Sequence, residues 1–168
     1  LFIEAKNITL SKDTEVTIFK NDVVIKTKDK IITSEYVEYN KKSGDLLIKT
    51  NVFAKDIFNN TIKTNNAEYN ENDNFFKSIG LTTITTSEDY VLEGEDIIVD
   101  NNNKIITSNK KSVLKDKDGN KIYLENFTFL SEENIFKSVG EIKIEDKMNN
   151  SYKFSQVYID TKKKEILG

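Results

Sequence analysis

The feature that most constrains this chain is a repeat of about 30 residues that runs from one end to the other. Six short segments recur with an apolar residue at their second position, and these six apolar residues are called the anchors. The anchors are Ile8, Val37, Ala67, Ile97, Phe127 and Val157, spaced by 29 residues once and by 30 residues four times. Such fixed spacing predicts one supersecondary unit stacked on itself, with an interior shared between neighbouring units.

The residues around each anchor predict that the unit is a bent strand. Apolar or aromatic residues lie five and three positions before the anchor, at the anchor, and two positions after it, as in Ile122, Leu124, Phe127 and Phe129. Alternation holds within each half but breaks between them, so an extra residue must be accommodated there. Glu125 with Asn126, and Ser155 with Gln156, occupy this joint. A repeated joint predicts a corner at which each strand passes from one sheet to a facing sheet.

Turn residues separate the strands. Asp and Asn occur four residues apart in three of the units, as Asp56 and Asn60, Asp116 and Asn120, and Asp146 and Asn150. Their short side chains bond nearby backbone groups, and Asn tolerates left-handed geometry. Asp118-Gly119 is a strong hairpin signal. Gly80 and Gly140 end two near-identical segments, Phe76-Lys77-Ser78-Ile79-Gly80 and Phe136-Lys137-Ser138-Val139-Gly140.

These patterns predict an all-β protein in which antiparallel strands build one elongated, twisted body of two sheets. Helix is disfavoured because β-branched and aromatic residues alternate with polar ones over short runs. The 168 residues suit a single domain spanning 1–168 and hold about five and a half units. The chain starts and stops inside the strand pattern, at Leu1 and Gly168, so we expect it to be part of a longer protein.

The composition narrows the functional classes. There is no His and no Cys, which removes the imidazole base, the thiolate nucleophile and the usual zinc ligands. We therefore expect no enzymatic activity and no cofactor or metal. The net charge is −3 and there is no basic block, so nucleic acid is not an expected partner.

Several short motifs inside the repeat resemble a known family. Thr50-Asn51-Val52 and Gly140-Glu141-Ile142 open strands, Asp118-Gly119-Asn120 forms a turn, and Ala67-Glu68-Tyr69 ends an alternating run. Together they resemble the OstA-like domain of the lipopolysaccharide transport family, found in LptA, LptC and the periplasmic N-terminal part of LptD. The final stretch, Ile159–Gly168, is most similar to the part of LptD that precedes its outer-membrane barrel. The resemblance covers almost the whole chain and ranks LptD first, with LptA or LptC next.

This resemblance implies a curved, open β-jellyroll in the periplasm, tethered to the outer membrane through a following barrel. Its apolar interior would hold the acyl chains of lipopolysaccharide, and its edge strands would dock other transport proteins head to tail. The inward residues expected to contact lipid are Ile8, Leu10, Ile32, Val37, Tyr39, Ile62, Ala67, Tyr69, Leu92, Ile97, Val99, Ile122, Leu124, Phe127, Phe129, Tyr152, Phe154, Val157 and Ile159.

The residues also admit plainer interpretations. The inward apolar columns could fill a dry core, as in a structural or adhesive β-solenoid with a packed interior and no lipid. Glu93 with Glu95, and Asp13 with Glu15, are expected on solvated strand faces rather than in an acid–base or calcium site. The Lys162-Lys163-Lys164 run is likewise expected to be solvated rather than bound to lipid phosphates.

Overall fold

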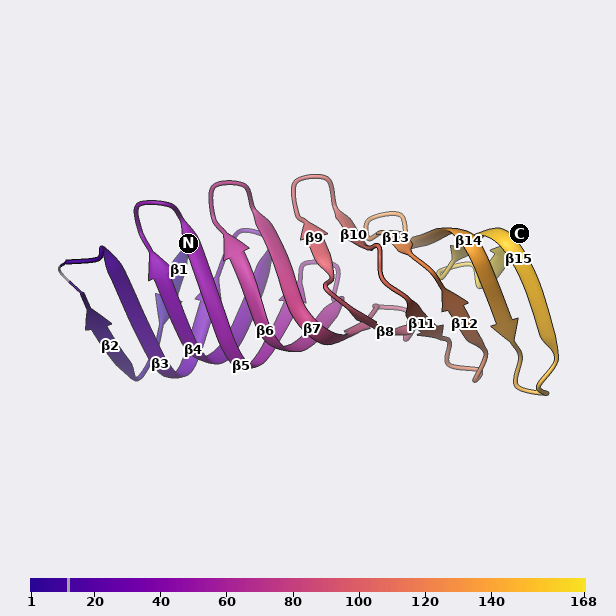
Figure 1. Cartoon of the computed structure of the whole chain (residues 1–168), viewed down its shortest axis with the longest axis horizontal. Coiled ribbons are helices and arrows are strands. Elements are labelled where there is room, and N and C mark those ends of the chain that lie inside the picture. The colour runs from indigo at the N-terminus through magenta and orange to yellow at the C-terminus, as the bar shows by residue number, and fades with distance from the viewer. Residues whose placement is uncertain (12) are drawn as a thin grey trace.

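The computed structural model describes residues 1–11 and 13–168, and in these ranges every regular element is a β-strand (Figure 1). The strands follow one another along the long axis of the molecule, with the first and last at opposite ends. They are β1 (Phe2–Glu4), β2 (Asn7–Leu10), β3 (Val16–Lys26), β4 (Lys30–Asn40), β5 (Asp45–Asp56), β6 (Thr61–Asn70), β7 (Phe75–Thr85), β8 (Val91–Glu95), β9 (Ile98–Asp100), β10 (Ile105–Ser108), β11 (Ser112–Lys115), β12 (Lys121–Leu124), β13 (Phe127–Leu130), β14 (Ile135–Glu145), β15 (Ser151–Asp160) and β16 (Glu165–Leu167). The described ranges contain no helix with the length and apolar character needed to cross a membrane.

All the strand pairs are antiparallel and join the 16 strands into one hydrogen-bonded sheet. Strands β3 to β7, β14 and β15 are 10 to 12 residues long and bend midway. Elsewhere the same path is divided into two short strands, as in β8 with β9, β10 with β11 and β12 with β13. The sheet thus folds at a corner into two facing layers. The layer that carries the anchors is called the anchor layer, and the other the opposite layer. The predicted all-β, two-sheet, antiparallel architecture is confirmed.

Shifts of strand register locate the corner. At each shift two residues of one strand lie opposite a single residue of its neighbour, which is a β-bulge. The two-residue sides are Asn21–Asp22, Thr50–Asn51, Gly80–Leu81 and Gly140–Glu141, and the single residues are Glu35, Asn65 and Ser155. Gly80 has a φ of 79° and Asn51 a φ of 56°, a region that Gly and Asn occupy most readily. The joint predicted at Ser155 is confirmed, although the two-residue side lies on the partner strand.

Small hydroxyl side chains line the inner side of the corner. The Ser78 hydroxyl oxygen accepts a hydrogen bond from the Ile97 backbone N–H at 2.9 Å and another from the Thr82 hydroxyl at 2.7 Å. Ser138 donates to the Asn126 carbonyl at 2.6 Å. Backbone groups that lose their ladder partners at a bulge need substitutes, because a buried polar group without a partner is costly. The buried members of this lining are Ser34, Thr64, Ser78, Thr82, Ser108, Ser112 and Ser138.

The core is a set of apolar columns that run across the strands. In the anchor layer the cross-strand partners Phe19, Val37, Ile48 and Ala67 form one column. In the opposite layer Ile25, Ile32, Ala54, Ile62, Ile84 and Leu92 form another. Toward the C-terminal half the interior is aromatic, and the rings of Phe129 and Phe136 stack with their centroids 4.2 Å apart. All these residues belong to one continuous core.

The turns form two rows, one along the free edge of each layer. The opposite-layer row consists of the loops at 27–29, 57–60, 86–90, 116–120 and 146–150, and the anchor-layer row includes those at 41–44, 71–74, 101–104, 131–134 and 161–164. Asp116 accepts hydrogen bonds from the backbone N–H groups of Asp118 and Asn120, both at 2.9 Å. The Asp56 and Asp146 turns repeat this geometry, which confirms the predicted turn chemistry. The side where the two rows face each other, away from the corner, is called the mouth.

Candidate lipid-binding interior

Most of the residues predicted to face inward are buried between the layers. Fourteen of the 19 are at most 7% exposed: Ile32, Val37, Ile62, Ala67, Tyr69, Leu92, Ile97, Val99, Ile122, Leu124, Phe127, Phe129, Val157 and Ile159. Tyr39 and Phe154 are partly buried and pack against the same core. These positions form a continuous apolar lining. That they contact lipid remains a prediction.

Three of the predicted inward residues lie on strands near the ends of the body and are exposed to solvent. Ile8 is 59% exposed, Leu10 65% and Tyr152 47%. Ile8 pairs with the buried Phe19, so it lies on the interior side of its strand. However, β2 is the last strand of the anchor layer, and β16 covers only the Tyr158–Asp160 part of β15. The apolar interior is therefore uncovered at both ends of the molecule.

Sequence reasoning centred on the anchors missed half of the lining. The strands between the anchor strands contribute buried side chains from both layers, among them Phe19, Val23, Ile25, Leu46, Ile48, Val52, Phe76, Ile84, Ile106, Leu114, Phe136 and Ile142. Their signal is also present in the sequence, because apolar residues alternate with polar ones on either side of each two-residue bulge. Aligning the chain on those strands as well would have found them.

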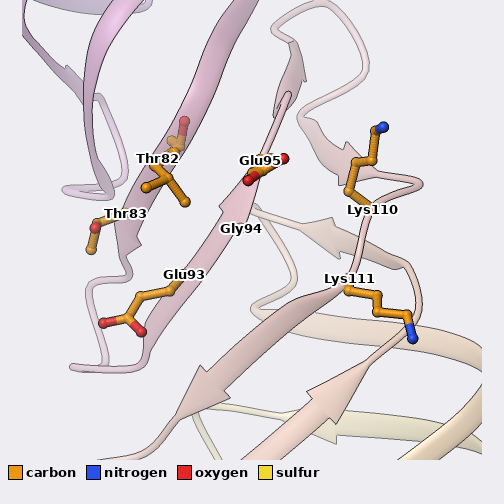
Figure 2. Close-up of a pocket in the computed structure, with 8 residues that line it drawn as sticks. Thr82, Thr83, Glu93, Gly94, Glu95, Lys110 and Lys111 are labelled. Atoms are coloured by element: carbon orange, nitrogen blue, oxygen red, sulfur yellow. The ribbon is translucent and has the colours of Figure 1, made fainter.

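In the described part of the chain the apolar core is packed. Hollows lie on the outer surface, and one of about 330 Å³ lies at the mouth between Thr27 and Asn74. Figure 2 shows one hollow, of about 600 Å³, beside the corner between β7, β8 and the segment that joins β10 to β11. Glu93 and Lys111 line it, but Figure 2 shows their charged groups turned away from each other. Glu93 pairs with Lys115 at 2.9 Å, and Lys111 with Glu125 at 3.2 Å. The charged groups do not converge there, so the hollow offers no constellation for acid–base chemistry.

Polar contacts bridge the two layers at the mouth. One carboxylate oxygen of Asp29, in the opposite-layer row, accepts a hydrogen bond from the Asn74 amide at 3.1 Å. The other accepts one from the Lys104 ammonium at 3.3 Å. Partial burial acts to raise the pKa of Asp29, but the hydrogen bonds from Asn74 and Lys104 outweigh it and hold the pKa below its ordinary value. Asp29 is therefore ionised at neutral pH and joins the two layers.

Lys30 lies next to this contact and is only 5% exposed. Its ammonium nitrogen is 5.3 Å from the centre of the Phe76 ring, which belongs to the anchor layer. Burial lowers the pKa of Lys30 to about 8, against the opposing attraction of Asp56 and Asp29. Nearby, burial together with the hydrogen bond to Glu71 raises the pKa of Tyr39 to about 12. The apolar interior thus has a polar border along the mouth.

Comparisons with known proteins leave this chain without an assigned family. No family model matches it, and no curated protein matches it. Among solved structures, it is similar to LptH of Pseudomonas aeruginosa, described as the LptA-homologous periplasmic component of the conserved lipopolysaccharide transport device. The two are 11% identical over 99% of this chain and 80% of that chain, with a TM-score of 0.29. The fold described above rests on the geometry of this chain, and the assignment to LptD stays a prediction.

Proposed function

We propose that this chain is a periplasmic module of lipopolysaccharide transport, which holds lipid acyl chains between its two layers and docks neighbouring modules through its end strands. One observation carries the proposal: a single apolar interior runs the full length of the body and is uncovered at both ends. The resemblance of the repeat motifs to the OstA-like domain supports the same conclusion and supplies the identity of the lipid.

The energetics of this interior suit acyl chains. Burying apolar surface is worth about 25 cal/mol per Å², or roughly 0.8 kcal/mol for each methylene group. Because the interior is already packed, an acyl chain must separate the layers or displace side chains such as Phe127 and Val37. The backbone joins the layers along the corner, whereas side chains alone join them at the mouth. Separation about the corner therefore breaks few hydrogen bonds.

A photo-crosslinking experiment tests the cargo. A photoreactive amino acid placed at Val37, Phe127 or Val157 should form adducts with lipopolysaccharide in cells. The matched controls are Glu38 and Thr128, which directly follow two of these positions and point to the outer face. Adducts confined to the outer positions would refute the proposed interior site.

The end strands supply the proposed docking surfaces. Leu10 is 65% exposed on β2 at one end, and Leu167 is 66% exposed on β16 at the other. Unpaired edge strands readily add a further strand. The chain has no Cys, so Leu10→Cys protein mixed with Leu167→Cys protein should yield a disulfide-linked pair. Met148→Cys, on an exposed turn, should not link to either one. Equal linking by Met148→Cys would show random collision instead of docking.

The filled interior favours a second candidate, a structural or adhesive β-body without lipid. The pairing is antiparallel throughout the described strands, so the molecule is not a solenoid of parallel coils, and that part of the alternative is corrected. Its packed interior is still consistent with the structure. Lack of lipid adducts at every interior position, in a protein that folds normally, would select this candidate.

A further inference from the structure

The attraction between the two rows of turns differs along the length of the mouth. Asp29 accepts two side-chain hydrogen bonds from the anchor-layer row, one from Asn74 and one, also an ion pair, from Lys104. The Asp29 side chain is 13% exposed and that of Lys104 is 28% exposed, so water screens this pair less than it screens an exposed pair. Asp29 and Lys104 are 75 residues apart in the sequence. One loop at 27–29 therefore holds turns from two different units of the anchor layer.

The other end of the mouth carries no such attraction. Lys117 belongs to the opposite-layer row and Lys164 to the anchor-layer row, and the interaction with Lys117 lowers the pKa of Lys164. The attraction of Asp118, Asp89 and Glu88 acts on Lys117 and offsets part of this repulsion. Two like charges facing each other do not pull the layers together. The contacts of Asp29 thus join the layers near the N-terminal end of the mouth.

Lys30 opposes closure at the joined end. Its ammonium is buried beside Phe76, where desolvation disfavours the charged form. Separation of the layers would return this ammonium to water, whereas the Asp29 contacts with Asn74 and Lys104 favour contact between the layers. Asp29 favours the closed state and the adjacent Lys30 favours the open state. A small perturbation of either residue therefore shifts the balance between the two states.

The structure assigns to the segment Thr27–Lys30 the role of a clasp: Asp29, bound to Asn74 and Lys104, holds the mouth closed, and its release lets the layers part about the corner so that an acyl chain enters from the side. The corner is suited to act as the hinge, because its bulges leave the ladder locally unpaired and Gly80 and Gly140 adopt positive φ values. The identity of the cargo rests on the proposed function, whereas the clasp itself does not.

The test measures the separation of the layers directly. Lys63 is exposed on the outer face of the opposite layer, and Lys77 on the outer face of the anchor layer. Because the chain has no Cys, the double variant Lys63→Cys/Lys77→Cys carries two thiols for spin labels and no others. Packed sheets lie about 10 Å apart. An acyl chain inserted between them adds about 4 Å, the contact distance of carbon atoms. Double electron–electron resonance should show this increase in the distance between the two spin labels when a pyrene-labelled fatty acid is added.

The clasp predicts how variants change this opening. Asp29→Asn should reach half of the opening at about five- to tenfold lower fatty acid, the lower end of the range of about 5- to 150-fold that is usual for coupling between two sites. Lys104→Gln, which removes the same ion pair from the other partner, should shift it in the same direction. Glu93→Gln is the matched control, because it breaks an ion pair with Lys115 inside one layer. If both mouth variants titrate like Glu93→Gln, the clasp is refuted.

A parallel titration with purified lipopolysaccharide separates the two proposals. If the fatty acid opens the mouth more readily in Asp29→Asn and lipopolysaccharide never opens it, the clasp stands and the proposed function fails. If lipopolysaccharide opens wild-type and Asp29→Asn protein at the same concentration, the proposed function stands and the clasp fails.

Discussion

Lys30→Met is expected to stabilise the protein at neutral pH, although it removes a charged side chain from a border with water. The structure supplies the magnitude. Burial lowers the pKa of Lys30 from 10.5 to about 8, and each pKa unit corresponds to about 1.4 kcal/mol, so the buried ammonium costs about 3 kcal/mol. Methionine keeps the length and apolar stem of the side chain. It forfeits the contact of the ammonium with the Phe76 ring, worth about 1 kcal/mol. The net expectation is a gain of about 2 kcal/mol in the free energy of unfolding.

The stability difference between wild type and Lys30→Met is expected to depend on pH. In the unfolded chain Lys30 keeps its proton until the pH approaches 10.5, whereas the folded protein releases it near pH 8. Between these values the unfolded state binds more protons, so the wild-type protein becomes more stable relative to the variant as the pH rises. The advantage of Lys30→Met should be complete below about pH 8 and should vanish as the pH approaches 10.5.

Urea unfolding of both proteins, measured at steps from neutral pH to about pH 10, provides the assay. Lys63→Met is the control for loss of a lysine side chain, because Lys63 is exposed on an outer face. The reasoning is refuted if Lys30→Met is less stable than wild type at neutral pH. It is equally refuted if the difference stays constant across the pH series.

Substitutions at three further positions test the corner and the core by urea unfolding. Ser78→Ala should destabilise the protein by about 1–3 kcal/mol, because the Ile97 N–H loses its acceptor, and an unchanged midpoint would contradict that role. Gly80→Val should cost about 1–2 kcal/mol and Gly80→Asn less, because the φ of 79° excludes β-branched residues while no atom lies within 4 Å of an added Cβ. Equal costs would indicate that φ is not the constraint. Phe136→Ala should cost about 3–5 kcal/mol through loss of its stack on Phe129, and a cost below 1 kcal/mol would mean that the core collapses around the gap.

Local pattern in the sequence was sufficient for the strand halves and the corner. Residues five and three before each anchor, such as Ile122 and Leu124, face inward because alternation within a half is a property of the strand itself. The break at Ser155 revealed the corner for the same reason. The hydroxyl lining was missed, because Ser78 and Ser138 read as ordinary polar residues until the bulge beside them shows which backbone groups they satisfy.

Features that depend on distant parts of the chain could not be predicted. Ile8 has the same local pattern as Val37, yet it is exposed because no further strand covers β2. The Asp29 contact joins loops 45 and 75 residues apart, and the twist that brings them together is a property of the whole stack. Lys30 occupies a position that is Asn60, Tyr90, Asn120 and Asn150 in later units, so its special environment appears only once the layers are assembled.

Hydrogen bonds between neighbouring turns hold successive units at a fixed spacing along the long axis of the molecule. The Asn60 side-chain oxygen accepts a hydrogen bond from the Ser87 N–H, and Asn120 accepts one from Lys147, 27 residues further on in both cases. Each unit adds two strands to each layer, which corresponds to roughly 10 Å of length. Because neighbouring units meet in the same way, one unit gained or lost leaves the end strands as they were. The distance between the two docking ends can therefore change in steps of one unit without any redesign of the ends themselves.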